Sequence, residues 1–244
     1  AAKVAAAPEM GFSAPLPLHD SLFAHQRAIV DWAITRGRAA IFAAFGLGKT
    51  RMQIELARQT CAHTGGRFLI VAPLGVRGEF LRDGAAMGVN ITFIRRTAEA
   101  GETGVYLTNY ESVRDELPDG TRKVDPREFD GASLDEASCL RGFGDTKTFR
   151  EFMALFAGDD RRDMSQRVTG EAVRYRFVAT ATPSPNDFIE LLAYAAFLDV
   201  MDVSTAKTRF FQRDSEHADE LTIHPHKVKE FWLWVSTWSR SKTV

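Results

Sequence analysis

The chain has 244 residues, enough for one large hydrophobic core, and its 45% hydrophobic and 26% charged residues are ordinary for a globular protein. The formal net charge of −1 excludes a strongly basic chain, so a nucleic-acid surface would have to come from local clusters such as the five arginines within residues 67–96. Two cysteines exclude a disulfide framework, and no run approaches the about 20 apolar residues of a membrane span, so we expect a cytoplasmic protein without membrane contact.

The N-terminal part of the chain predicts a tail followed by a helix. Residues 1–18 mix alanine and proline without an apolar period, which indicates a flexible tail. A helix follows from about Leu22, with apolar residues at helical spacing. Gln26 stands at its start, 23 residues before Lys49, where its amide could pair with adenine; a surface glutamine without this role is the alternative.

The sequence AAFGLGKT at residues 43–50 organises the chain. It follows the apolar run 39–42 and precedes a helix over 50–62, so it predicts a strand, a glycine loop and a helix. Glycines let backbone N–H groups close on a phosphate, and the helix N-terminus adds positive charge. Lys49 would neutralise phosphates and the Thr50 hydroxyl would bind Mg. The predicted nucleotide-binding residues are Gln26, Phe45, Gly46, Leu47, Gly48, Lys49, Thr50 and Arg51.

Strands and helices then alternate. Residues 67–73 are uniformly apolar and predict a buried strand, and further strands are expected at 91–94 and 105–110. A helix with Val76 and Phe80 on its apolar face separates the first two of these strands. Strand, helix and strand at this interval predict parallel pairing with right-handed crossovers, hence an α/β fold.

Adjacent carboxylates follow the next predicted strand. Asp135 and Glu136 would be costly to bury at a strand end unless they met a cation. In a nucleotide hydrolase, Asp135 would hold Mg through water and Glu136 would deprotonate the attacking water. Gly131 and Ser133 stand where aliphatic residues are expected. A surface Asp-Glu pair is the alternative, and the glycine loop 86 residues earlier favours the catalytic interpretation.

The last predicted strand of the sheet covers residues 175–180. Thr180 and Thr182 follow at its carboxyl end, where sheet ligands bind, so they could sense the γ-phosphate; capping of the next helix is the alternative. Before this strand, residues 149–156 predict a core-facing helix and residues 158–174 a charged surface insertion.

The C-terminal part predicts a helical extension. Three tryptophans lie within seven residues, so they cannot all face one core and some are expected to contact another domain. These residues are Trp232, Trp234 and Trp238. His224 and His226 have no third ligand nearby in the sequence, which favours a surface turn over a metal site.

Together, the motifs FAHQ, AAFGLGKT, LIVAPL, LTNYES, LDEAS and ATATPSPND resemble, in order and spacing, the first motor domain of superfamily-two helicases. The resemblance covers about residues 22–200 and is closest to Swi/Snf-type DNA translocases and their phage-borne relatives. It is supported by Ala43, which stands where the full loop pattern has glycine, as is common in helicase-type motors; Ser138 departs from the histidine of the DEAH pattern. The resemblance implies a RecA-like P-loop fold with a mostly parallel sheet and helices on both faces, ATP with Mg, and movement along double-stranded DNA.

The same resemblance assigns further residues and domains. It implies that Thr180, Ala181 and Thr182 couple the ATP state to DNA. It also implies contacts with the DNA backbone for Pro73, Leu74, Arg77, Thr108 and Asn109. The expected organisation is a tail at 1–18, an ATPase domain at 19–203 and a helical extension at 204–244 leading toward an absent second RecA-like domain.

Such motors hydrolyse ATP between two domains, so this chain is expected to be a half-motor that binds ATP and hydrolyses it weakly. Two alternatives stay open at this point. One is a nucleic-acid or protein binding module in which ATP is a structural ligand. The other is a packaging or restriction motor with a nuclease, which would need a second acidic cluster that the sequence does not show.

Overall fold

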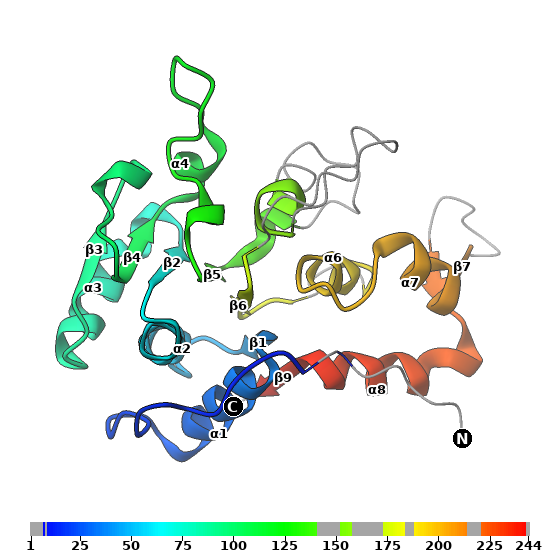
Figure 1. Ribbon diagram of the computed structural model, residues 1–244. Coiled ribbons are helices and arrows are strands. Elements are labelled where there is room, and N and C mark those ends of the chain that lie inside the picture. The colour runs from blue at the N-terminus through cyan, green and yellow to red at the C-terminus, as the bar shows by residue number, and fades with distance from the viewer. Residues whose placement is uncertain are drawn as a thin grey trace.

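A seven-stranded parallel sheet forms the centre of the computed structural model, which describes residues 7, 9–140, 152–157, 173–183, 188–213 and 221–242 (Figure 1). The strand order is β3-β4-β2-β5-β6-β1-β9, and every pairing in it is parallel. The bounds are β1 Arg38–Ala43, β2 Arg67–Val71, β3 Ile91–Phe93, β4 Gly104–Thr108, β5 Gly131–Asp135, β6 Tyr175–Thr180 and β9 Ser239–Lys242. A separate antiparallel pair joins β7 Phe211–Arg213 to β8 Leu221–Ile223.

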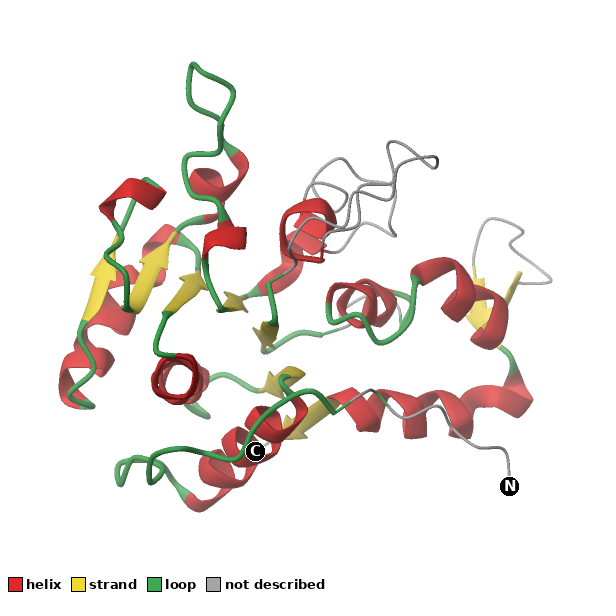
Figure 2. Cartoon of the chain, viewed as in Figure 1, coloured by secondary structure: helices red, strands yellow, loops and turns green. Residues whose placement is uncertain are grey.

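Helices cover both faces of the sheet, as Figure 2 shows. On each face, the helices and the sheet pack together and form one hydrophobic cluster. The first face carries α1 Ala24–Arg36, α2 Lys49–Thr64 and α3 Arg77–Ala86. The second carries α4 Tyr110–Arg114, α6 Glu190–Phe197, α7 Val203–Phe210 and α8 Val228–Trp238. This confirms the predicted α/β class with a parallel sheet.

Strand β1, next to the edge strand β9, shows how the sheet is buried on both sides. All six of its residues are buried. Ala39 and Ile41 belong to the cluster under α1 and α2, while Ala40 and Phe42 belong to the cluster under α6 and α8. Alternation of side chains along a strand thus supplies both cores, and such strands read as continuous apolar runs.

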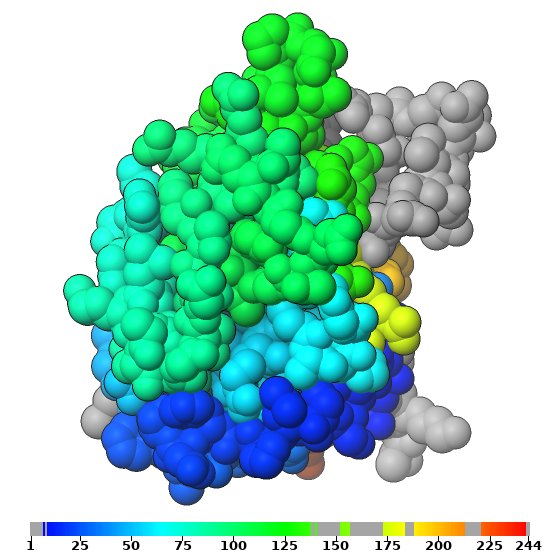
Figure 3. All heavy atoms as spheres, turned by 60° about the vertical axis from the view of Figure 1, so that its left-hand side comes forward, coloured from blue at the N-terminus to red at the C-terminus, as the bar shows by residue number. Residues whose placement is uncertain are grey.

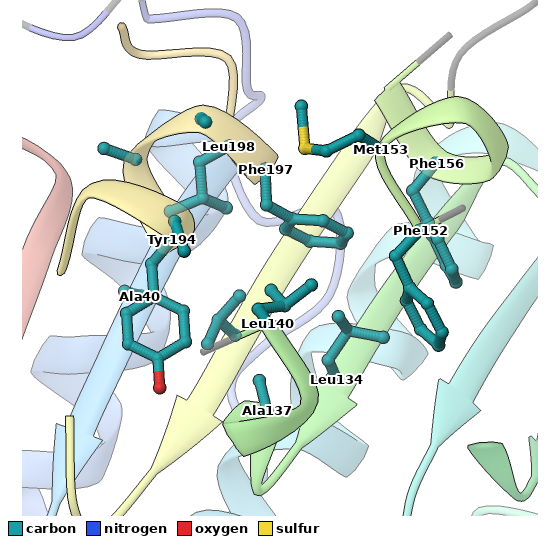
Figure 4. Close-up of a cluster of buried hydrophobic side chains, with 14 of the residues drawn as sticks. Ala40, Leu134, Ala137, Leu140, Phe152, Met153, Phe156, Tyr194, Phe197 and Leu198 are labelled. Carbon is teal, nitrogen blue, oxygen red and sulfur yellow. The ribbon is translucent and has the colours of Figure 1, made fainter. Parts of the chain in front are cut away.

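A close-up of the second cluster shows how it supports the middle of the sheet (Figure 4). Leu134 on β5 and Ala40 on β1 point toward the same group of aromatic side chains. Phe152 and Phe156 stack with their ring centroids 5.5 Å apart, and Phe156 lies 5.4 Å from Phe197 of α6. The strand that ends in Asp135 is therefore fixed from this side by apolar packing.

The segment before α1 differs from the predicted flexible tail. The Met10 and Phe12 N–H groups donate to the Arg36 and Ile34 carbonyls at 3.2 and 3.1 Å. Phe12 is only 9% exposed and stacks on His63 of α2. Figure 3 shows this blue segment and α1 lying directly against the cyan part of the surface. Backbone hydrogen bonds and the buried Phe12 ring hold the segment in place. Such contacts need no periodic apolar pattern, so the sequence did not predict that the segment is ordered. Residues 1–6 and 8 lie outside the described residues.

The C-terminal part is not a separate extension either. β9 pairs with β1 in the main sheet, from Ala40 opposite Ser239 to Ala43 opposite Lys242. Trp234 and Trp238 are 1% and 0% exposed and belong to the second cluster, whereas Trp232 is 41% exposed. Two of the three tryptophans therefore serve this core, because α8 leads directly into a strand of the same sheet.

Several expectations fall outside the described residues: Phe149 of the predicted helix, the insertion over residues 158–172, and residues 184–186 after the last strand. Within the described residues, no helix combines the length and the apolar character needed to cross a bilayer.

Candidate nucleotide-binding site

The glycine loop connects β1 to α2 as the sequence predicts. Gly46 and Gly48 have φ values of +80° and +77°, a left-handed backbone that glycine adopts without strain. Gly48 precedes the first residue of α2, and a Cβ there would lie 2.2 Å from Nε2 of Gln26. Side chains at these positions would therefore distort the loop whose N–H groups begin the helix.

Lys49 lies at the centre of the site. Its Nζ donates to the Ala43 carbonyl at 3.3 Å and lies 3.7 Å from Oε1 of Glu136. The same ammonium is 4.9 Å from the ring centroid of Phe45, which is 73% exposed. The structure thus brings the predicted loop lysine and the predicted carboxylate together across 87 residues of sequence, from 49 to 136.

Thr50 and Arg51 contact α3. The Thr50 hydroxyl donates to Oε1 of Glu79 at 2.6 Å, and Arg51 lies 3.6 Å from Asp83. Glu79 is a site residue that the sequence analysis missed. Its only signal was a carboxylate in the first turn of the helix after a buried strand.

Asp135 ends β5 and is 5% exposed. Its Oδ1 accepts a hydrogen bond of 2.7 Å from Nε2 of Gln53, a fully buried residue of α2 that the sequence analysis also missed. The pKa of Asp135 is raised to about 6, chiefly by burial; the charges of Glu136 and Glu79 contribute to the rise, while the Gln53 bond and Lys49 oppose it.

Glu136 links β5 to β6. It has a left-handed φ of +49°, unusual for a residue other than glycine, and its N–H donates to the Ala179 carbonyl at 2.8 Å. The Thr180 hydroxyl donates to Oε2 of Glu136 at 3.2 Å and accepts from the Thr182 N–H at 3.2 Å. Two of the three predicted coupling residues therefore form one bonded series with this carboxylate, with Ala181 between them in sequence.

Gln26 is 2% exposed and uses both ends of its amide within the protein. Nε2 donates to the Leu47 carbonyl at 3.0 Å, and Oε1 accepts from the Phe23 N–H at 2.9 Å. Gln26 thus ties the start of α1 to the glycine loop. Reading adenine through this amide would require one of these bonds to be exchanged.

The predicted DNA-contacting residues divide into two groups. Leu74 is 57% exposed, and the exposed Arg77 lies 4.1 Å from the ring centroid of Phe93. Thr108 is buried and donates to the Ile94 carbonyl at 2.9 Å, while Asn109 caps α4 by accepting from the Ser112 N–H. Pro73 is half-buried. Leu74 and Arg77 are thus the exposed side chains among the five, while Asn109 is half-buried like Pro73.

The donor set fits a Mg ion held together with phosphates. Thr50 and Asp135 offer oxygen ligands, and Asp135 experiences more negative charge from Glu136 and Glu79 than Lys49 balances. Within the described ranges, no group of three or more His, Cys, Asp or Glu residues could hold a metal by itself. Mg in proteins is usually bound by one or two carboxylates, and substrate phosphates and water supply its other ligands, which matches this arrangement.

Comparisons with known proteins give structural similarity only. No protein-family model matches the chain, and no curated protein matches it in sequence. The SWI2/SNF2 ATPase core of Sulfolobus solfataricus in complex with dsDNA matches with a TM-score of 0.65 and 16% identity, over 95% of this chain and 46% of that chain. The SWI2/SNF2 ATPase core domain from the same organism matches with a TM-score of 0.64 and 16% identity, over 98% of this chain and 48% of that chain.

The helicase domain of Pyrococcus furiosus Hef matches with a TM-score of 0.51 and 14% identity, over 72% of this chain and 36% of that chain. The chain thus spans less than half of each of these three structures. At such identities the likeness shows a shared fold, and it agrees with the motifs quoted above. The chain has the RecA-like fold of helicase-type ATPase cores.

Proposed function

We propose that this chain is the ATP-binding motor domain of an ATP-dependent DNA translocase or helicase. The observation that carries the proposal is the meeting of Lys49 with Glu136 at 3.7 Å, beside the buried Asp135 and behind a loop with two left-handed glycines. A lysine, a hydroxyl and two carboxylates at the carboxyl edge of a parallel sheet suit a nucleoside triphosphate.

Each residue has a distinct task in this proposal. The loop N–H groups and Lys49 bind the phosphates, while Thr50 and Asp135 hold Mg. Bound there, Mg would supply charge neutralisation for the phosphates and would polarise the bond that breaks. Glu136 accepts a proton from the attacking water. Thr180, bonded to Glu136, transmits the state of the site toward Thr182.

Double-stranded DNA is the proposed track. A matched ATPase core was solved with dsDNA, and the exposed Leu74 and Arg77 lie in the stretch that the family resemblance assigns to the DNA backbone. A guanidinium suits phosphate contacts, which position a protein without reading sequence. We therefore expect binding that falls steeply with salt and is indifferent to DNA sequence.

A second RecA-like domain or a partner chain completes the proposed motor. The matched cores are more than twice as long as the aligned part. Phe188, Val228, Trp232 and Leu233 are each more than 40% exposed, and the Phe188 and Trp232 rings lie 5.0 Å apart. We assign this apolar surface to that contact. The same surface favours the alternative, an ATP-stabilised protein-binding module without motor activity.

Nucleotide binding by this chain tests the proposal. Lys49→Ala should lower the affinity for a fluorescent ATP analogue with Mg by about 10- to 100-fold, since a charged hydrogen bond contributes about 1.5–3 kcal/mol. Lys229→Ala, which removes an exposed lysine on α8, is the matched control and should bind as the parent does. Equal affinities of Lys49→Ala and parent would refute the assigned site.

Turnover separates the motor from the binding module. Glu136→Gln should bind ATP as the parent does and abolish the hydrolysis that the parent shows, weak or strong, because the amide cannot accept the proton. If this variant hydrolysed ATP at the parental rate, the assignment of Glu136 as the proton acceptor would be wrong. A parent that binds ATP without hydrolysing it, even in the presence of DNA and of the proposed second RecA-like domain or partner chain, would favour the module.

A further inference from the structure

Strand β5 carries glycine and polar residues on one face only. Gly131, Ser133 and Asp135 alternate toward α2, while Ala132 and Leu134 face the aromatic cluster on the other side. Gly131 is explained by space, because a Cβ there would lie 2.7 Å from the ring of Phe68. Ser133 has no such steric reason, so its hydroxyl needs another explanation.

That hydroxyl begins a buried series of hydrogen bonds. The Ser133 hydroxyl donates to Oε1 of Gln53, and Nε2 of Gln53 donates to Oδ1 of Asp135 at 2.7 Å. Ser133 and Gln53 are both fully buried. Gln53 lies one helical turn after Lys49, so it projects from the same side of α2 toward β5.

The two bonds fix the direction of the amide. The ionised Asp135 carboxylate only accepts and so takes the NH₂ end of Gln53, which leaves the oxygen end to accept from the Ser133 hydroxyl. With the amide turned over, its oxygen would lie against the Asp135 carboxylate, which only accepts hydrogen bonds when ionised. Asp135 thus selects the direction of the amide, and Ser133 gives the amide oxygen a hydrogen-bond partner in that direction.

We propose that Ser133 and Gln53 are positioning residues, which hold the Asp135 carboxylate in the orientation that Mg and the phosphates need. This rests on the proposed function above. Residues that hold metal ligands in this way set metal affinity, and their substitution typically lowers it about 10- to 100-fold. Both side chains are fully buried and bond to each other and to Asp135, so binding of nucleotide without Mg should depend little on them.

The test titrates Mg against binding of a fluorescent ATP analogue by the purified chain. Ser133→Ala and Gln53→Met should each raise the half-saturating Mg concentration about 10-fold or more, while affinity in EDTA stays within about 2-fold of the parent. Because Ser133 acts through Gln53, the double variant should be no worse than Gln53→Met alone. Thr60→Val is the matched control: it removes a fully buried hydroxyl of α2 that donates to the Leu56 carbonyl, and should leave Mg dependence unchanged.

The possible outcomes distinguish failure of the positioning role from failure of the proposed function. Parental Mg dependence in Ser133→Ala and Gln53→Met, with intact circular dichroism, would overturn the positioning role and leave the proposed function standing. A fall in EDTA affinity equal to the fall with Mg would also overturn it, since that is general damage. If the parent itself shows no Mg-dependent ATP binding, the proposed function fails and takes this inference with it.

Discussion

The two faces of the sheet use different chemistry. On the face under α2, buried polar side chains bond to one another and to the backbone: Gln53 to Asp135, Gln59 to the Leu16 backbone, and Thr60 to the Leu56 carbonyl. On the face under α6 and α8, aromatic rings fill the core, with Trp234 and Trp238 5.5 Å apart. The first face holds the site and the N-terminal segment, and the second supplies most of the apolar burial. Variants of the two faces should therefore damage different properties.

The largest expected effect lies on the aromatic face. Trp238 is 0% exposed, and its ring lies 6.1 Å from that of Phe42 in β1. Trp238→Ala should lower the free energy of unfolding by about 3–5 kcal/mol, the usual cost of such a cavity. Urea unfolding followed by far-ultraviolet circular dichroism measures it.

Trp238→Phe is the control for this variant, because it keeps an aromatic ring. Where Trp238→Ala is still folded, its ATP affinity should stay close to the parental value, since the loop bonds lie on the other face. A loss below about 1 kcal/mol would show that the aromatic face does not carry the stability assigned to it.

The second prediction concerns Asp135, on the polar face, and its pH dependence. Its pKa is raised from 3.8 to about 6, chiefly by burial, so the folded protein without metal bears a cost whenever this carboxyl is ionised. Below pH 4 the group is protonated in both states and contributes nothing; as pH rises from about 4 to 6 the folded state loses stability, and above 6 the full cost remains.

Asp135→Asn removes this charge while its amide oxygen can still accept from Gln53. In EDTA, we expect the variant to be more stable than the parent by up to about 3 kcal/mol at pH 8, at about 1.4 kcal/mol per pKa unit, with the difference vanishing near pH 4. Urea unfolding at both pH values checks this. A difference that is constant with pH would contradict the raised pKa, and the same variant should lose Mg-dependent ATP binding.

Much of the fold follows from the sequence because buried parallel strands are apolar throughout. The runs at β1, β2 and β6 predicted their strands to within two residues at each end. β9 gave no such signal: its residues are Ser-Arg-Ser-Lys, and it is an edge strand held by backbone pairing with β1. Backbone hydrogen bonds do not depend on side-chain type, so no pattern could have predicted this strand.

The site was predictable where a motif fixes the backbone and hidden where side chains meet across elements. Lys49, Asp135 and Glu136 come together as the motifs indicated. Glu79 contacts the site from the surface of α3, and Gln53 contacts it from the buried side of α2. Glutamate and glutamine are common in helices, so neither residue can be identified as a site residue from the sequence. Only the serine in β5, unexpected in a buried strand, pointed toward the missed bonds.

The third prediction concerns Gln26, whose amide is engaged by Phe23 and Leu47. Gln26→Ala should weaken binding of ATP and of GTP by the same factor, about 5- to 30-fold, because two neutral hydrogen bonds that hold the loop contribute about 1–2 kcal/mol. Competition of each nucleotide against the fluorescent analogue measures both. Gln26→Glu keeps the acceptor for the Phe23 N–H but places a buried carboxylate oxygen against the Leu47 carbonyl, so it should bind no better than the alanine variant. Loss of ATP binding with GTP binding intact would instead assign adenine reading to Gln26.

The smallest effect is expected at Trp232, on the outer side of α8. It is 41% exposed, and its ring centroid lies 5.0 Å from that of Phe188 and 5.3 Å from that of Phe231. Trp232→Gln should therefore change the free energy of unfolding by less than about 1.5 kcal/mol, the upper range for an aromatic pair. Trp234→Gln, two residues further along the same helix, should cost more than twice as much because it places an amide in the aromatic core. Equal losses in urea unfolding would mean that Trp232 belongs to the core and would remove the surface assigned to a second domain.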